Sequence, residues 1–220
     1  MSARPGSYIS LAGAGRAQSV VDKSRFIAFA APIDGEANAL QIIEGIKREH
    51  RDASAHAYAY IDGYAGNLRR FNDGGEPSGT AGLPLLDFMA AKNLTRCLCV
   101  VTRWFGGVKL GKGGLIRAFG GCGIQAMEDA GFALYELTQR AKVSLPYDLL
   151  GKVENRLLAT EYRTLSTDYA GGVTLLMAVR LRQFEAFGAQ MLDWTGARAR
   201  ITREGESDYE PWPLPETDNG

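Results

Sequence analysis

One run of the sequence, residues 96–130, constrains the fold most, because three different local patterns follow one another there without a break. The apolar stretch from Cys97 to Val101 is typical of a buried strand. A segment rich in glycine follows Phe105, and a helix-like stretch then continues to about Ala130. The run therefore predicts a strand, a tight turn and a helix in succession, as in a protein of mixed α and β structure.

The rest of the first half continues this mixed pattern. Ser78 or Thr80 is available as the N-cap of the predicted helix that begins at Pro77. Residues 1–21 contain Arg4 and Arg16 and no acidic residue, and we expect them to form a flexible leader. Strands are predicted over 24–33, 53–61, 68–72 and 96–105, and helices over 36–50, 77–92 and from the glycine-rich turn to about 130.

After Gly131 a second series of elements begins, and its order is that of a ferredoxin-like domain. Strands are predicted over 132–145, 161–169, 173–182 and 197–203, and helices over 146–160 and 183–194, which gives the order βαββαβ. From Glu206 onward proline and acidic residues dominate. We therefore predict an α+β protein with one domain over 1–131, a ferredoxin-like domain over 132–205, and a flexible acidic, proline-rich tail over 206–220.

Composition excludes several classes of protein. The formal net charge is +0, so no overall field attracts the chain to nucleic acid or to a membrane. No stretch approaches the roughly 20 apolar residues of a membrane span, and no signal peptide is evident. The 3 cysteines do not suggest a secreted disulfide framework, and the 2 histidines do not suggest a metal cluster. We expect a cytoplasmic protein that has no metal, no cofactor and no membrane partner.

The glycine-rich turn has the chemistry of an anion site. Between Phe88 and Met127 the sequence contains no aspartate or glutamate, but it contains six lysines and arginines. Glycines allow backbone N–H groups to approach a ligand closely, and the start of a helix adds positive potential. We expect the following residues to contact phosphate: Arg103, Lys109, Lys112 and Arg117 through their side chains, and Gly106, Gly107, Gly111 and Gly113 through their backbone.

Two alternatives apply to the same turn. Residues 106–113 almost match the phosphate-binding loop GxxxxGK[ST], but Gly113 occupies the position of the hydroxyl that would hold magnesium. Binding of an anion without nucleotide hydrolysis is therefore favoured. Alternatively, glycines at 113, 114, 120, 121 and 123 would allow a helix to pack closely against a sheet. Both roles can hold at once.

A second dense segment, residues 72–82, contains the carboxylates Asp73 and Glu76. They could form an acid/base pair, but a structural role near the positive start of a helix, or the orientation of one of the cations, is favoured. His56 lies among tyrosines on an alternating strand, where a half-buried histidine is favoured over a catalytic base. No catalytic residue is therefore assigned.

Four segments together resemble the YigZ/IMPACT family over roughly residues 20–130. They are Lys23-Ser-Arg-Phe-Ile-Ala, Ala55-His-Ala-Tyr-Ala-Tyr60, Asn72-Asp-Gly-Gly-Glu-Pro-Ser-Gly-Thr-Ala-Gly-Leu-Pro84 and Val101-Thr-Arg-Trp-Phe-Gly-Gly-Val-Lys-Leu-Gly-Lys-Gly-Gly-Leu115. The resemblance implies a first domain like domain 2 of ribosomal protein S5 and a second domain like the terminal domain of elongation factor G. Eukaryotic relatives regulate translation by binding an activator of an initiation-factor kinase, and nucleic-acid or ribosome binding is suggested for bacterial relatives.

From the residues and this resemblance together, we expect a translation-linked regulator without catalysis. Its partner would be RNA, the ribosome or a translation-regulating protein, bound through the basic glycine-rich loop. One alternative is an enzyme that acts on a small phosphorylated or nucleotide substrate, with Glu76 or His56 as the acid/base group. The other is a protein-binding module that docks an acidic partner.

Overall fold

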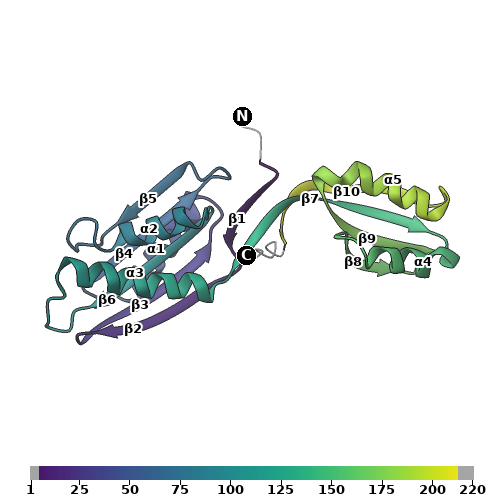
Figure 1. Ribbon diagram of the computed structural model, residues 1–220. Helices are drawn as coiled ribbons and strands as arrows, with labels where there is room; N and C mark the ends of the chain where they lie inside the picture. Colours follow the sequence, from purple (N-terminus) through teal and green to yellow (C-terminus); the bar gives the residue numbers. More distant parts are fainter. Residues whose placement is uncertain (1–4, 213–220) are drawn as a thin grey trace, which may run out of the picture. The chain divides into compact units, whose positions relative to one another are not determined.

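The computed structural model describes residues 5–212, and these residues form two compact units (Figure 1). The first unit consists of the chain up to Tyr135 together with the segment that begins at Pro211, and the second unit spans Glu136–Glu210. The division therefore lies four residues after the boundary expected at 131/132. The expected α+β class is confirmed.

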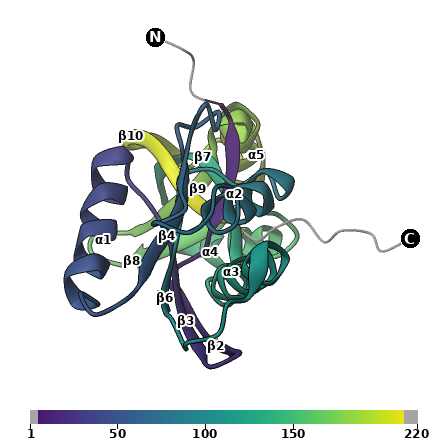
Figure 2. The ribbon, with the colours of Figure 1, turned by 90° about the vertical axis from the view of Figure 1, so that its left-hand side faces the viewer.

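The first unit is built on a five-stranded antiparallel sheet in the order β2-β3-β6-β4-β5. Figure 2 shows helix α1 on one side of this sheet and helices α2 and α3 on the other. The strands are β2 (Gly15–Val21), β3 (Ser24–Pro32), β4 (Ala55–Asp62), β5 (Leu68–Asn72) and β6 (Cys97–Trp104), and the helices are α1 (Glu36–Glu49), α2 (Gly82–Ala91) and α3 (Gly111–Asp129).

The main core of this unit lies between the sheet and α2 and α3, on what we call the inner face. Phe119 of α3 meets Phe26 of β3 edge to face, with 5.1 Å between the ring centroids. Burying each such side chain stabilises the fold by about 1.5–3 kcal/mol. A Cβ at Gly123 would lie only 2.2 Å from Leu85 Cδ2, whereas a Cβ at Gly121 would meet no atom within 4 Å. Of these two glycines, only Gly123 is needed for the close packing that the sequence suggested.

Helix α1 covers part of the opposite, outer face of the sheet. Ile43 of α1 packs there with Tyr60 of β4 and Leu98 of β6 in a smaller core. The phenol of Tyr60 donates a 2.6 Å hydrogen bond to Glu36 Oε1 at the start of the helix. These contacts fix α1 over β4 and β6.

The expected flexible leader is wrong over most of its length, because it contains two strands. Strand β1 (Ser7–Leu11) buries Leu11 completely, and β2 pairs with β3 along its whole length. Local propensity gives little signal because residues 1–21 as a whole are rich in glycine, serine and alanine, so pairing and burial define these strands. Residues 1–4 lie outside the described part of the chain.

The second unit has the predicted ferredoxin-like order. It contains α4 (Tyr147–Leu157), β8 (Arg163–Asp168), β9 (Val173–Arg180) and α5 (Phe184–Thr195), together with most of the long strands β7 (Phe132–Leu145) and β10 (Arg200–Trp212). Strand β7 pairs with β9 and β10, and β9 pairs with β8. Val153 of α4 and Phe187 of α5 pack on Leu175 of β9 in a continuous core. The flexible tail expected over 206–220 is wrong for residues 206–212, because β10 continues through them. Residues 213–220 lie outside the described part of the chain.

Candidate functional site

The glycine-rich loop between β6 and α3 uses its glycines in two ways. Gly107 and Gly111 have φ values of +87° and +67°, which a residue with a side chain rarely adopts. Gly106 serves close packing instead, since a Cβ there would lie 2.1 Å from the carbonyl carbon of Lys23 in the turn between β2 and β3. The loop is thus held against that turn at one end and enters α3 through a left-handed glycine at the other.

Three predicted cations lie exposed where α3 begins. Lys109 precedes the helix, and Lys112 and Arg117 lie in its first two turns. Among the described residues, no ion pair involves these three side chains. The first turn of this 19-residue helix contains no acidic residue, and the N-cap Leu110 offers no side-chain hydrogen bond. The helix N-terminus and the three cations therefore add their positive potentials at one place.

Arg103 does not join these cations, because its side chain points into the inner face of the sheet. It is only 5% exposed, and its Nη1 donates a 2.6 Å hydrogen bond to Glu76 Oε1. Its Nη2 reaches Ser24 Oγ at 3.2 Å, and its guanidinium lies over the rings of Phe26 and Phe105 at 5.6 and 5.3 Å. The expected phosphate contact by Arg103 is therefore corrected to internal support of the loop.

Two serines bind the backbone at the start of the loop. Ser54 Oγ accepts a hydrogen bond from the N–H of Phe105 at 2.9 Å, and Ser24 Oγ accepts one from the N–H of Gly106 at 3.1 Å. The N–H of Gly106 is thus already used, which corrects its expected role as a donor to an anion. Phe105 itself remains 49% exposed beside this anchored backbone. The serines were missed because their partners lie 51 and 82 positions away in sequence.

Asp73 organises the start of α2. Its Oδ2 accepts the N–H of Gly79, and its Oδ1 accepts those of Ala81 and Gly82, each at 2.9 Å. Burial alone would raise the pKa of Asp73, but these N–H donors outweigh burial and lower it. The predicted caps, Ser78 or Thr80, are wrong: α2 begins at Gly82, and no side chain of its N-cap residue bonds the helix. These hydrogen bonds are what the expected structural role of Asp73 requires.

Glu76 and His56 lie on opposite faces of the sheet. Glu76 forms an ion pair with Arg103 on the inner face, at 2.6 Å. His56 pairs with Thr102 across β4 and β6, and its Nδ1 lies 3.1 Å from Thr102 Oγ1 on the outer face. Burial, with the nearby charge of Lys47, lowers the pKa of His56. The two candidate acid/base groups therefore do not share a site.

Within residues 5–212, no group of three histidine, cysteine, aspartate or glutamate side chains could hold a metal ion. The three cysteines are buried, and burial raises the pKa of the Cys97 thiol to about 12. In the same range, no helix is long and apolar enough to cross a membrane.

Comparison with known proteins matches both units. Residues 22–127 match the model of the Impact N-terminal domain, and residues 143–198 match a domain of unknown function, DUF1949. The chain is 36% identical to the IMPACT family member YvyE of Bacillus subtilis (strain 168), over 92% of this chain and 93% of that protein. The chain belongs to the IMPACT family.

A second IMPACT family member and a solved structure agree with this assignment. The chain is 33% identical to the IMPACT family member YigZ of Escherichia coli (strain K12), over 80% of this chain and 87% of that protein. A solved structure described as a hypothetical protein superposes with a TM-score of 0.59 at 28% identity, over 90% of this chain and 97% of that one. The glycine-rich loop and the segment around Asp73 both lie inside the region that matches the Impact N-terminal domain.

Proposed function

We propose that this IMPACT family chain is a non-catalytic, translation-linked regulator that binds RNA or the ribosome through its basic loop. The basic loop is defined here as residues 105–117. One observation carries the proposal: Lys109, Lys112 and Arg117 are exposed at the N-terminus of α3, and no acidic residue lies in the first turn of that helix. Anionic ligands are favoured at such a place by charge and by the free N–H groups of the first helical turn.

The support beneath the loop strengthens this proposal. Arg103, Glu76 and two serine hydroxyls anchor the start of the loop from within the unit. The exposed cations therefore extend from an anchored backbone, so that less freedom is lost when they bind. The exposed ring of Phe105 beside them offers a surface on which a base can stack.

The salt dependence of RNA binding tests the proposal. Each phosphate contact with single-stranded RNA contributes about −0.7 to the slope of log K against log salt. The pair Lys109→Glu plus Arg117→Glu should therefore reduce this slope by about 1.4 and weaken binding at low salt. The measurement is fluorescence anisotropy of a labelled single-stranded RNA at a series of salt concentrations.

A matched control keeps the total charge change the same. Lys152 on α4 and Arg200 on β10 are exposed and belong to the second unit. The pair Lys152→Glu plus Arg200→Glu should leave the slope close to that of the wild type. Equal losses in the two double variants would show that net charge, and not the basic loop, governs RNA binding.

A further inference from the structure

The outer face of the first unit's sheet is only partly covered, and the uncovered part has a defined chemistry. On the outer face, helix α1 packs on β4 and β6, whereas no helix covers β2 or the part of β3 beside it. Strand register places three residue pairs side by side there: Arg16 with Phe29, Gln18 with Ile27, and Val20 with Arg25. Val20 is 65% exposed, so this strip presents apolar surface to solvent.

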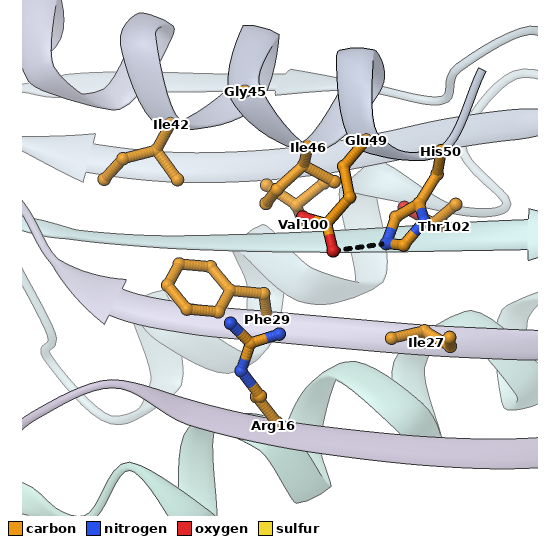
Figure 3. A pocket seen from close by; sticks show the side chains of 10 residues that line it. All are labelled: Arg16, Ile27, Phe29, Ile42, Gly45, Ile46, Glu49, His50, Val100 and Thr102. Carbon is orange, nitrogen blue, oxygen red and sulfur yellow. Dashed lines mark ion pairs between the residues drawn. The ribbon is translucent and has the colours of Figure 1, made fainter.

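A groove of about 290 Å³ runs between α1 and this strip (Figure 3). Its lining is mainly aliphatic and aromatic. Gly45 lies on the helix side of the groove, and a Cβ there would meet no atom within 4 Å. The groove therefore reaches the backbone of α1. We call it the α1 groove, and its apolar lining comes from Ile27, Phe29, Ile42, Ile46 and Val100.

The charges at the edges of the α1 groove are unequal. The guanidinium of Arg16 lines the groove and lies over the ring of Phe29 at 5.1 Å. Arg25 lies outside the lining, over the ring of Trp104, whose Nε1 donates to Asp52 Oδ2 at 2.9 Å. The outer-face residues of β2 and β3 include no carboxylate. On the opposite wall Glu49 is 64% exposed in its side chain and turns toward His50 at 3.9 Å. The strand side of the groove thus complements an acidic group placed next to an apolar one.

We infer that the α1 groove binds a peptide segment of a partner protein. One large aliphatic or aromatic side chain of that segment enters the groove between Ile46 and Phe29. A carboxylate near that side chain pairs with Arg16 at the rim. This arrangement is that of an interface anchor, in which one buried apolar side chain carries most of the binding energy and a charged pair at the edge sets the register.

The dimensions and the lining favour this occupant over the others. The volume of about 290 Å³ lies just below the roughly 300–1,000 Å³ usual for small-molecule sites, and it suits a single large side chain. Nucleic acid is disfavoured because mainly aliphatic side chains line the groove. The basic loop includes the start of α3, and α3 packs on the inner face of the sheet, whereas the α1 groove lies on the outer face. The α1 groove and the basic loop are therefore separate surfaces.

Filling the groove from the helix side provides the test. Gly45→Leu places a side chain in the open space and also favours the helix, so the unit should remain folded. Gly151 of α4 is the matched control, because it is another glycine inside a helix with no atom within 4 Å of its Cβ position. Short random peptides displayed on phage are selected on the wild-type full chain, and their affinities for both variants and for Arg16→Glu are then measured.

We expect selected peptides that combine a large apolar residue with an aspartate or glutamate close by. Gly45→Leu and Arg16→Glu should each weaken their binding at least about tenfold. Gly151→Leu should leave it unchanged, and circular dichroism should show that all three variants are folded. The inference fails if no peptide prefers the wild type over Gly45→Leu, if the bound peptides lack acidic residues, or if Gly45→Leu removes binding of RNA instead.

Discussion

Removal of the Glu76 carboxylate should destabilise the first unit more than any exposed charge does. Glu76 pairs with Arg103 through a 2.6 Å hydrogen bond, and the two side chains are only 11% and 6% exposed. In Glu76→Ala the guanidinium would remain buried between Phe26 and Phe105 with its strongest partner missing. An uncompensated buried charge is expensive because the protein interior solvates it poorly.

The expected magnitude follows from this burial. Breaking a buried ion pair by removing one partner costs about 3–5 kcal/mol. The remaining hydrogen bond to Ser24 holds Arg103 in place but leaves its charge unbalanced. At about 4 °C per kcal/mol for a domain of this size, the melting temperature of the first unit should fall by about 12–20 °C.

The loss of stability is measured by urea unfolding of the full chain. Hydrogen exchange is used to monitor the unfolding and is read separately for peptides of each unit. Glu49→Ala removes an exposed carboxylate of the same unit and should change the free energy of unfolding by less than about 0.5 kcal/mol. The double variant Glu76→Leu plus Arg103→Met should be more stable than Glu76→Ala, because no charge is then left buried. A loss below about 1 kcal/mol in Glu76→Ala would refute this account of the pair.

Two further predictions concern the same unit. The lowered pKa of Asp73 stabilises the fold above the ordinary aspartate value of about 4, and this contribution is lost as the pH falls through the lowered pKa. Asp73→Asn should therefore lower the free energy of unfolding at pH 7. It should also make that free energy less dependent on pH in urea melts between pH 7 and 2. An unchanged pH profile would contradict the capping role. Gly123→Ala should cost about 1–3 kcal/mol because its Cβ would strike Leu85. Gly121→Ala, with open space, should stabilise α3 by up to about 1 kcal/mol, and equal effects of the two in thermal melts would contradict the close contact.

The elements with a strong hydrophobic period were predictable from sequence. The helix expected over 36–50 forms as Glu36–Glu49, and the strand expected over 96–105 forms as Cys97–Trp104. Helix α2 was expected to begin at Pro77 but begins at Gly82, where the N–H groups of Ala81 and Gly82 donate to Asp73, a carboxylate outside the helix. Strand β2 was missed because its pairing with β3, and not its own propensity, defines it.

The candidate site was predictable in part. The left-handed Gly107 and Gly111 and the exposed lysines follow from local sequence, because turns and helix starts depend on near neighbours. The burial of Arg103 does not, since its partner Glu76 lies 27 positions away and is brought near it only by the fold. The α1 groove left no local signal either, because its lining comes from one helix and three strands.

Co-sedimentation with ribosomes tests the proposed function most directly. Wild-type chain should pellet with ribosomes at low salt and be released at high salt, because contacts to phosphate are screened. The variant Lys109→Glu plus Arg117→Glu should stay in the supernatant at low salt, whereas Lys152→Glu plus Arg200→Glu should pellet like the wild type. If the basic-loop variant pellets as the wild type does, or if the wild type never pellets and binds no RNA, the proposal is contradicted.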